Sequence, residues 1–201
     1  MIYLIRHGRT EFNVEGRFQG NFDSPLTPLG LQQAAANGAL IRSLIGDPSG
    51  WRLESSPLGR AMHTAQIIAE TAGLAPPIPD DRLREIGMGS FDGMTVEDIS
   101  FAFPRESEGS SRHDIYFRSP DGESFETIGA RLKSWLDEAV ADDRPRIVVS
   151  HGVAGRVLRG LYAGLDYEAT IKLDVPQDAV FRLEGGRIEQ IDALAISQPE
   201  R

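Results

Sequence analysis

Short, uninterrupted apolar runs alternate along the chain with longer segments in which apolar residues recur at helical spacing. The runs predict strands buried on both faces, and the longer segments predict amphipathic helices. The predicted strands are residues 2–5, 51–54 and 147–149, with 76–79 as an edge strand or an extended linker. The predicted helices are residues 28–46, 60–73, 95–103, 124–140 and 153–161. This alternation predicts an α/β fold: a three-layer α/β/α sandwich whose central sheet is mostly parallel, with helices on both faces.

The remaining segments predict two loops and a hairpin. Residues 11–23 show no sustained period and contain glycines, so we expect a structured loop over a ligand crevice. The polar, turn-rich stretch at about 94–122 predicts a lid-like insertion. Glycines within 184–186, between apolar runs at 179–183 and 187–191, predict a β-hairpin. No internal repeat or linker divides the sequence, so we expect a single domain over all 201 residues.

The composition is typical of a soluble globular protein, with 40% hydrophobic and 25% charged residues. A domain of this length buries roughly 70% of the surface of its unfolded chain, so it needs no disulfide or metal for stability. The net charge of −9 disfavours nucleic acid and anionic membranes as partners. It does not disfavour a small anionic ligand, because a local cluster of arginines can oppose the field of the whole chain.

The chain has no cysteine, which excludes thiol chemistry, cysteine-based zinc sites and disulfides. The first predicted strand starts at residue 2, which leaves no room for the charged and apolar regions of a signal peptide. No apolar run approaches the ~18 residues that a membrane span needs. We therefore expect a cytoplasmic protein.

The two most apolar predicted strands each end in a histidine followed by a glycine. Arg6-His7-Gly8 ends the first strand, and Ser150-His151-Gly152 ends the other. The carboxyl ends of parallel strands form the ligand crevice of open α/β sheets, and glycine there permits a close approach of the backbone to a ligand. One such histidine alone could be an ordinary strand-end residue. Two in matched contexts predict that both imidazoles lie at one edge of one sheet.

Arginines and a helix start on the same predicted edge favour an anion. Arg6 ends the first strand, and Arg60 lies in the first turns of the second predicted helix. Their planar guanidinium groups suit bidentate contact with phosphate oxygens. Gly152 and Val153 begin a helix whose free N–H groups and dipole also favour an anion. Together these features predict a phosphate site.

Two histidines and a glutamate supply groups that can react with such a phosphate. His7 and His151 can act as nucleophile or general base, and Glu85, in a glycine-spaced loop, supplies a carboxylic acid. With the two arginines they suit phosphoryl transfer without a metal, in which positioning and charge stabilisation dominate.

Five blocks of sequence carry these residues, in order from residue 1 to about 160. They are Arg6-His7-Gly8 with Thr10 and Asn13, Ser56 to Ala65, Leu83 to Gly89 with Phe91-Asp92-Gly93, Pro120 to Ser124, and Val149 to Gly152. Together, and in this order, the blocks resemble the histidine phosphatase superfamily, in its phosphoglycerate-mutase-like group. The resemblance covers most of the chain.

The resemblance implies a reaction through phosphohistidine, with no cofactor and no metal. It implies that His7 takes the phosphoryl group on an imidazole nitrogen and that Glu85 donates a proton to the leaving oxygen. The residues that would hold the phosphate are Arg6, Arg60 and His151, the last also being counted among the catalytic residues. The residues that align with family positions near the substrate are Asn13, Gln19 and Gly20.

Several residues depart from the pattern of the family or lie where it gives no guide. Arg9 stands where an acidic or amide residue is usual, and adds positive charge beside the expected pocket. His63 stands where glutamine is common. It is either a residue on the surface of a helix or a residue that lies behind the pocket. The lid-like insertion also contains basic and aromatic residues, which are either solvated loop residues or substrate contacts. They are Arg105, Arg112, His113, Tyr116 and Arg118.

The segment after Glu85 favours a phosphatase over a mutase. Mutases of the superfamily carry an Arg-His-Tyr-Gly type segment there, whereas residues 86–93 read Ile-Gly-Met-Gly-Ser-Phe-Asp-Gly. The predicted function is therefore a metal-independent phosphomonoesterase that acts through phosphohistidine on a small phosphorylated metabolite. A cofactor-dependent phosphoglycerate mutase is the alternative.

Two other classes are disfavoured. A non-catalytic phosphate-binding protein would be expected to have lost at least one of the reactive residues, and all are present. A metallohydrolase would need paired ligands such as His-x-His, which the sequence lacks. The expected partner is a small phosphorylated metabolite or inorganic phosphate, and the C-terminal hairpin is also compatible with a homodimer.

Overall fold

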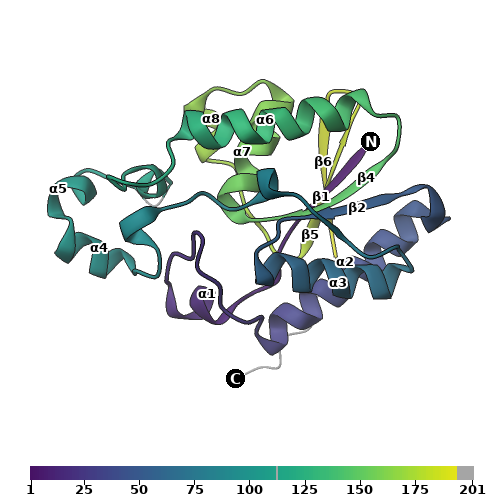
Figure 1. Cartoon of the computed structure of the whole chain (residues 1–201), viewed down its shortest axis with the longest axis horizontal. Helices are drawn as coiled ribbons and strands as arrows, with labels where there is room; N and C mark the ends of the chain where they lie inside the picture. Colours follow the sequence, from purple (N-terminus) through teal and green to yellow (C-terminus); the bar gives the residue numbers. More distant parts are fainter. Residues whose placement is uncertain (112, 194–201) are drawn as a thin grey trace.

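The computed structural model describes residues 1–111 and 113–193 (Figure 1). Within them, six strands form one mixed sheet in the order β3-β2-β4-β1-β5-β6. The strands are β1 Ile2–Arg6, β2 Arg52–Ser55, β3 Ile78–Pro79, β4 Arg146–Ser150, β5 Ala179–Glu184 and β6 Arg187–Asp192. The α-helices are α1 Glu11–Glu15, α2 Pro28–Ile45, α3 Gly59–Ala72, α4 Val96–Ala102, α5 Pro104–Ser107, α6 Phe125–Ala141, α7 Gly152–Ala163 and α8 Tyr167–Ile171.

The centre of the sheet is parallel, as the apolar runs predicted. β1 pairs in parallel with β4, with Arg6 opposite Ser150, and β2 and β3 continue the parallel part. The C-terminal hairpin lies on the chain's own sheet, because β5 runs antiparallel to β1 and β6 antiparallel to β5. The stretch with Pro79 forms the edge strand β3, where a missing N–H costs no ladder bond.

Helices cover both faces of the sheet, because side chains alternate along each strand. Ile2 and Leu4 of β1 pack with residues of α6 and α7 on one face, whereas Tyr3 and Ile5 pack with residues of α2 and α3 on the other. Figure 1 shows α6 and α7 above the sheet and α2 and α3 below it. The predicted three-layer sandwich is therefore confirmed.

Local caps set the ends of the predicted helices. The side chain of Thr27 accepts a hydrogen bond from the N–H of Gly30, with Pro28 in the first turn of α2. Ser124 caps α6 in the same way. Gly73 ends α3 with a φ of 73°, a backbone conformation that favours glycine. The predicted helices are confirmed to within one or two residues.

Three short helices were not predicted: α5, which lies in the expected insertion, and two whose starts are capped by side chains. Residues 11–23 were expected to form a loop, but they begin with α1, in which Thr10 and Asn13 cap each other's backbone. Its five residues are too few to show a helical period. The second, α8, begins at a cap by Asp166 and is equally short. Capping, not periodicity, was the available signal in both cases.

The segment predicted as a lid-like insertion contains α4, α5 and a turn of 3₁₀-helix at Ile115–Phe117. In Figure 1, α4 and α5 lie to one side of the sheet. That this segment closes over a ligand stays a prediction, and Arg112 lies outside the described residues. Among the described helices, none is both long and apolar enough to cross a membrane.

Candidate active site

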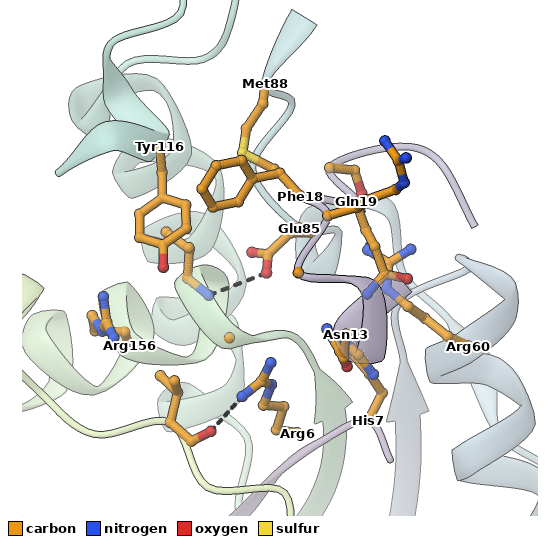
Figure 2. A pocket seen from close by; sticks show the side chains of 16 residues that line it. Arg6, His7, Asn13, Phe18, Gln19, Arg60, Glu85, Met88, Tyr116 and Arg156 are labelled. Atoms are coloured by element: carbon orange, nitrogen blue, oxygen red, sulfur yellow. Dashed lines mark hydrogen bonds between the residues drawn. The ribbon is translucent and has the colours of Figure 1, made fainter. Parts of the chain in front are cut away.

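A pocket of about 230 Å³ opens at the carboxyl end of β1 (Figure 2). It is lined by these predicted site residues: Arg6, His7, Asn13, Gln19, Gly20, Arg60, Glu85 and Gly152. The other lining residues are Gly16, Arg17, Phe18, Met88, Tyr116, Val153, Arg156 and Val175. Segments far apart in the sequence therefore meet where the strand-end rule placed the ligand crevice.

His7 lies at the floor of this pocket with only 2% of its surface exposed. Its Nδ1 lies 2.8 Å from the carbonyl oxygen of Gly8. A carbonyl oxygen can only accept, so Nδ1 carries the proton and Nε2 carries the lone pair. Gly8 has no room for a side chain, because an added Cβ would lie 2.3 Å from the carbonyl oxygen of Gly30. The tight packing of this turn therefore fixes the tautomer of the imidazole.

The charge state of His7 is set by its surroundings. Burial lowers the pKa of the imidazole well below its ordinary value, and the positive charges of Arg60 and Arg6 lower it further. The ring is therefore neutral near pH 7, and the lone pair on Nε2 is free to act as a nucleophile.

His151 lies beside His7, at the end of the neighbouring strand β4. The two ring centroids are 5.2 Å apart, edge to face, which confirms that both imidazoles lie at one edge of the sheet. His151 is 1% exposed and does not line the pocket itself. Its Nε2 lies 2.7 Å from the hydroxyl of Ser56, whereas its buried Nδ1 has no hydrogen-bond partner among the described residues. Burial, followed by Arg60 and His7, also lowers the pKa of His151 well below its ordinary value.

Arg60 reaches the pocket from the first turn of α3 and is held mainly by backbone carbonyl groups. Its Nη2 donates to Gly20 at 2.9 Å, and its Nη1 donates to Phe22 at 2.6 Å. Nη1 also donates to a carboxylate oxygen of Asp23 at 2.9 Å, which is the ion pair of this arginine. Gly20 has a φ of 48°, and a Cβ there would collide with Asp92. The loop that follows α1 is thus shaped around the guanidinium of Arg60.

Arg6 ends β1, and its guanidinium is likewise held by a backbone group. Nη1 donates to the carbonyl oxygen of Val175 at 2.5 Å (dashed in Figure 2). Burial lowers the pKa of Arg6, and Glu85 acts in the opposite direction. The pocket is lined by four arginines and one glutamate, so its charge is positive although that of the chain is negative.

The carboxylate of Glu85 is fixed by the start of α7. One oxygen accepts from the N–H of Val153 at 3.1 Å, and the other accepts from the N–H groups of Ala154 at 2.8 Å and Ile86 at 3.1 Å. The free N–H groups of this helix, predicted to favour an external anion, are therefore directed in part at a carboxylate of the chain itself. In Figure 2, Glu85 points into the pocket.

The amides of Asn13 and Gln19 both use their oxygen atoms inside the protein. The oxygen of Asn13 accepts from Thr10 at 3.2 Å and from Gln177 at 3.1 Å. The oxygen of Gln19 accepts from the hydroxyl of Ser24 at 3.2 Å. Each amide can therefore offer the pocket its NH₂ group, which is a donor and suits an anionic ligand.

Several lining residues escaped the sequence analysis. Arg156 lies one turn after Gly152 on α7, so the helical spacing could have indicated it. Arg17 follows the C-cap of α1, a helix that was not predicted because residues 11–23 were expected to form a loop. Val175 lies between α8 and β5, where no motif marks it.

The residues that departed from the family pattern fall mostly outside the pocket. Arg9 does not line it, and His63 is exposed on α3. Tyr116 lines the pocket, and its ring packs edge to face with that of Phe18 at 5.3 Å. Arg118 is exposed and pairs with a carboxylate in the insertion. Arg105 is also exposed, and His113 does not line the pocket.

Over residues 1–111 and 113–193, no three His, Cys, Asp or Glu side chains gather closely enough to hold a metal ion. The lining of the pocket offers an anion two kinds of donor, guanidinium groups and amide NH₂ groups.

Comparisons with known proteins agree with this geometry. A model of the histidine phosphatase superfamily (branch 1) matches residues 2–190. A probable phosphoglycerate mutase, GpmB, of Salmonella arizonae is 33% identical over 222 residues, which cover 100% of this chain and 99% of that protein. The structure of Bacillus stearothermophilus YhfR has a TM-score of 0.78 and 26% identity, covering 98% of this chain and 97% of that one. A mycobacterial glucosyl-3-phosphoglycerate phosphatase has a TM-score of 0.75 and 30% identity, covering 90% of this chain and 87% of that one.

Proposed function

The chain belongs to the histidine phosphatase superfamily, and from that premise we propose that it is a metal-independent phosphomonoesterase of a small phosphorylated metabolite. The observation that carries the proposal is the imidazole of His7. It is buried, neutral and oriented by Gly8, and it lies in a pocket lined by four arginines and one glutamate. This combination suits a nitrogen nucleophile that attacks a bound phosphate dianion.

In the first half of the proposed reaction, the lone pair on Nε2 of His7 attacks phosphorus, and the bond from phosphorus to the ester oxygen breaks. The electron pair of that bond goes to the leaving oxygen, which takes a proton from the carboxyl group of Glu85. Nδ1 keeps its proton, so the phosphorylated ring is positively charged, and the carbonyl oxygen of Gly8 stabilises that charge. Arg6 and Arg60 stabilise the negative charge on the transferring group.

In the second half, water attacks phosphorus on the face that the alcohol has left. The water gives a proton to the carboxylate of Glu85, and the electron pair of the phosphorus–nitrogen bond returns to Nε2 of His7. Inorganic phosphate leaves, and both residues have regained their starting protonation. The same glutamate thus acts first as acid and then as base.

The other predicted site residues bind in this proposal and do not react. We assign the buried Nδ1 of His151, which lacks a partner among the described residues, to the phosphate as a donor. Gly152 lines the pocket where α7 begins, and its lack of a side chain lets the phosphate approach the guanidinium of Arg6, which an added Cβ would meet at 3.4 Å. The NH₂ groups of Asn13 and Gln19, with the backbone of Gly20, contact the phosphate or the rest of the substrate.

The second candidate is a cofactor-dependent phosphoglycerate mutase, which uses the same chemistry but returns the phosphoryl group to a second hydroxyl. The name of the Salmonella relative favours it, whereas the name of the mycobacterial relative favours a phosphatase. In this chain, the apolar and aromatic side chains of Phe18, Met88 and Tyr116 lie around Glu85 in Figure 2. They suit an alcohol with an apolar face better than a small carboxylate, and we therefore favour hydrolysis.

The test is release of inorganic phosphate from 4-nitrophenyl phosphate in the presence of a chelator. We expect the wild-type protein to be active and His7→Ala to lose at least about a thousandfold, as expected on removal of a nucleophile. His63→Ala is the matched control, because His63 is exposed on α3, and its activity should equal that of the wild type.

Two further results would decide between the candidates. Isomerisation of 3-phosphoglycerate with a bisphosphoglycerate primer, without comparable release of phosphate, would overturn the phosphatase proposal and favour the mutase. Activity that disappears in chelator and returns with a divalent metal would overturn the metal-independent mechanism.

A further inference from the structure

The block Pro120 to Ser124 takes no part in the proposed reaction, although it is one of the five that carry the resemblance. We propose that Glu123 of this block, with Arg131 of α6, is a positioning pair that holds the backbone of Glu85 so that its carboxyl group reaches the leaving oxygen. The inference rests on the proposed function, because it assigns Glu85 the role of proton donor.

Arg131 uses all five of its N–H groups, three on the loop of Glu85 and two on Glu123. Its Nη1 donates to the carbonyl oxygens of Arg82 and Arg84, both at 2.8 Å. Its Nη2 donates to the carbonyl oxygen of Glu85 at 2.9 Å. The remaining two bonds, from Nε and Nη2, go to the carboxylate oxygens of Glu123, both at 2.8 Å. All five donors of a guanidinium are thus satisfied, three of them by the backbone just before and at Glu85.

Glu123 holds the same loop from the other side of Glu85. Its carboxylate accepts from the N–H of Gly87 at 2.8 Å, and its own N–H donates to the carbonyl oxygen of Gly87 at 2.7 Å. The approach is close, because a Cβ on Gly122 would lie 2.9 Å from that carbonyl oxygen. Asp121 extends the contact by accepting from the N–H of Ser90 at 2.8 Å and from its hydroxyl at 2.7 Å.

The pair is built to stay charged and in place. Both side chains are about four-fifths buried, with 20% of Arg131 and 24% of Glu123 exposed. Burial acts to raise the pKa of Glu123, but the hydrogen bonds from Arg131 and Gly87 outweigh it and hold the pKa below its ordinary value. The carboxylate therefore remains ionised and keeps both bidentate contact with Arg131 and contact with the loop.

Glu85 is consequently held at two points by two different helices. The start of α7 fixes its carboxylate, and Arg131 of α6 fixes its backbone. The transfer of a proton requires hydrogen-bond reach of the leaving oxygen, so a shift of this loop would impair it, while His7, on β1, would remain in position. Loss of the pair should therefore affect proton donation and spare the attack by nitrogen.

The dependence of activity on the leaving group tests this separation. Nitrophenolate leaves without a proton, whereas an alkoxide such as that of glycerol phosphate needs one. In Arg131→Met, we expect kcat/KM to fall by about 10- to 100-fold on glycerol phosphate, which is part of the roughly 100- to 10,000-fold that a general acid contributes, and by less than about threefold on 4-nitrophenyl phosphate. Glu85→Gln, which lacks the acid itself, should show the same selectivity with a larger loss.

Three variants make the result specific. Arg131→Lys keeps the charge but not the fork of five donors, so it should recover only part of the loss. Glu123→Gln keeps an acceptor for Gly87 but not the charge, and it provides the same test if Arg131→Met does not fold. Lys133→Met, which breaks an exposed ion pair on the same helix, should leave both activities unchanged.

Equal losses on the two substrates in Arg131→Met and Glu123→Gln would overturn the inference, because they would indicate general damage to the fold. Undiminished activity on glycerol phosphate in both variants would also overturn it. Failure of the proposed function looks different: the wild-type protein itself would then hydrolyse neither substrate.

Discussion

The two ends of β4 each border a cluster of charges around a buried arginine, and the clusters differ in how those charges are balanced. At the start of the strand, the guanidinium of Arg146 is 1% exposed and donates to Glu54 at 2.8 Å and to Asp142 at 2.9 Å. Glu54 accepts in addition from the indole N–H of Trp135 at 2.8 Å and pairs with Arg52. Every charge in this cluster meets an opposite charge.

At the far end of the same strand, the balance is different. The guanidinium groups of Arg6 and Arg60 are held chiefly by backbone carbonyls, and Asp23 is the carboxylate that pairs with Arg60. Carbonyl dipoles orient a guanidinium but do not cancel its charge. The comparison indicates that the charges of the first cluster are balanced within the protein, whereas the second leaves positive charge that is available to an anion.

The largest expected effect follows from removal of the charge of Arg146. In Arg146→Met we expect the free energy of unfolding to fall by about 3 kcal/mol, because Glu54 would remain buried with part of its compensation lost. Urea denaturation measures this change, and kcat of the folded protein should not change. The double variant Arg146→Met, Glu54→Gln should recover much of the loss. A loss in the single variant below about 0.5 kcal/mol, typical of an exposed site, would contradict the comparison.

Removal of Arg60 should have the converse effect. In Arg60→Met we expect the Kd for inorganic phosphate to rise by about 10- to 100-fold, which corresponds to a charged hydrogen bond of about 1.5–3 kcal/mol. Calorimetric titration with phosphate measures it. Arg9→Met is the control, because Arg9 does not line the pocket and should leave the Kd unchanged. Similar rises in Kd in the two variants would mean that phosphate binding depends on the net charge alone.

The third expected effect is on the dependence of stability on pH. His7 and His151 have depressed pKa values in the folded protein, so below about pH 6.5 the unfolded chain binds protons that the folded protein excludes. The two histidines therefore do not reduce the free energy of unfolding above that pH, and they reduce it increasingly as the pH decreases. Each histidine contributes a slope approaching about 1.4 kcal/mol per pH unit in the free energy of unfolding.

The variant His151→Asn isolates this contribution. Its stability, measured by denaturant titration from pH 7 to pH 5, should fall less steeply than that of the wild type. His63→Asn, which changes an exposed histidine, should follow the wild type. Parallel curves for the wild type and His151→Asn would show that burial does not keep this imidazole neutral.

Much of the fold could be predicted from local patterns. The apolar runs at residues 2–5 and 147–149 indicated the central parallel strands, and the caps Thr27 and Ser124 marked the starts of α2 and α6. Local signals failed where an element was too short for its period to appear, as in α1. They also could not show what the segment 94–122 does, because turn residues indicate an insertion but not its contacts.

The sequence by itself determined many of the groups that the site contains, because strand ends and helix starts place side chains by rules that act over a few residues. It brought two histidines and Arg6 to one edge of the sheet. Only the tertiary structure decided how those groups are used. The proton on Nδ1 of His7 depends on a turn packed against Gly30, and the carboxylate of Glu85 is bound by the start of α7, nearly 70 residues away. Such contacts join segments distant in the chain, so packing, and not local pattern, selects them.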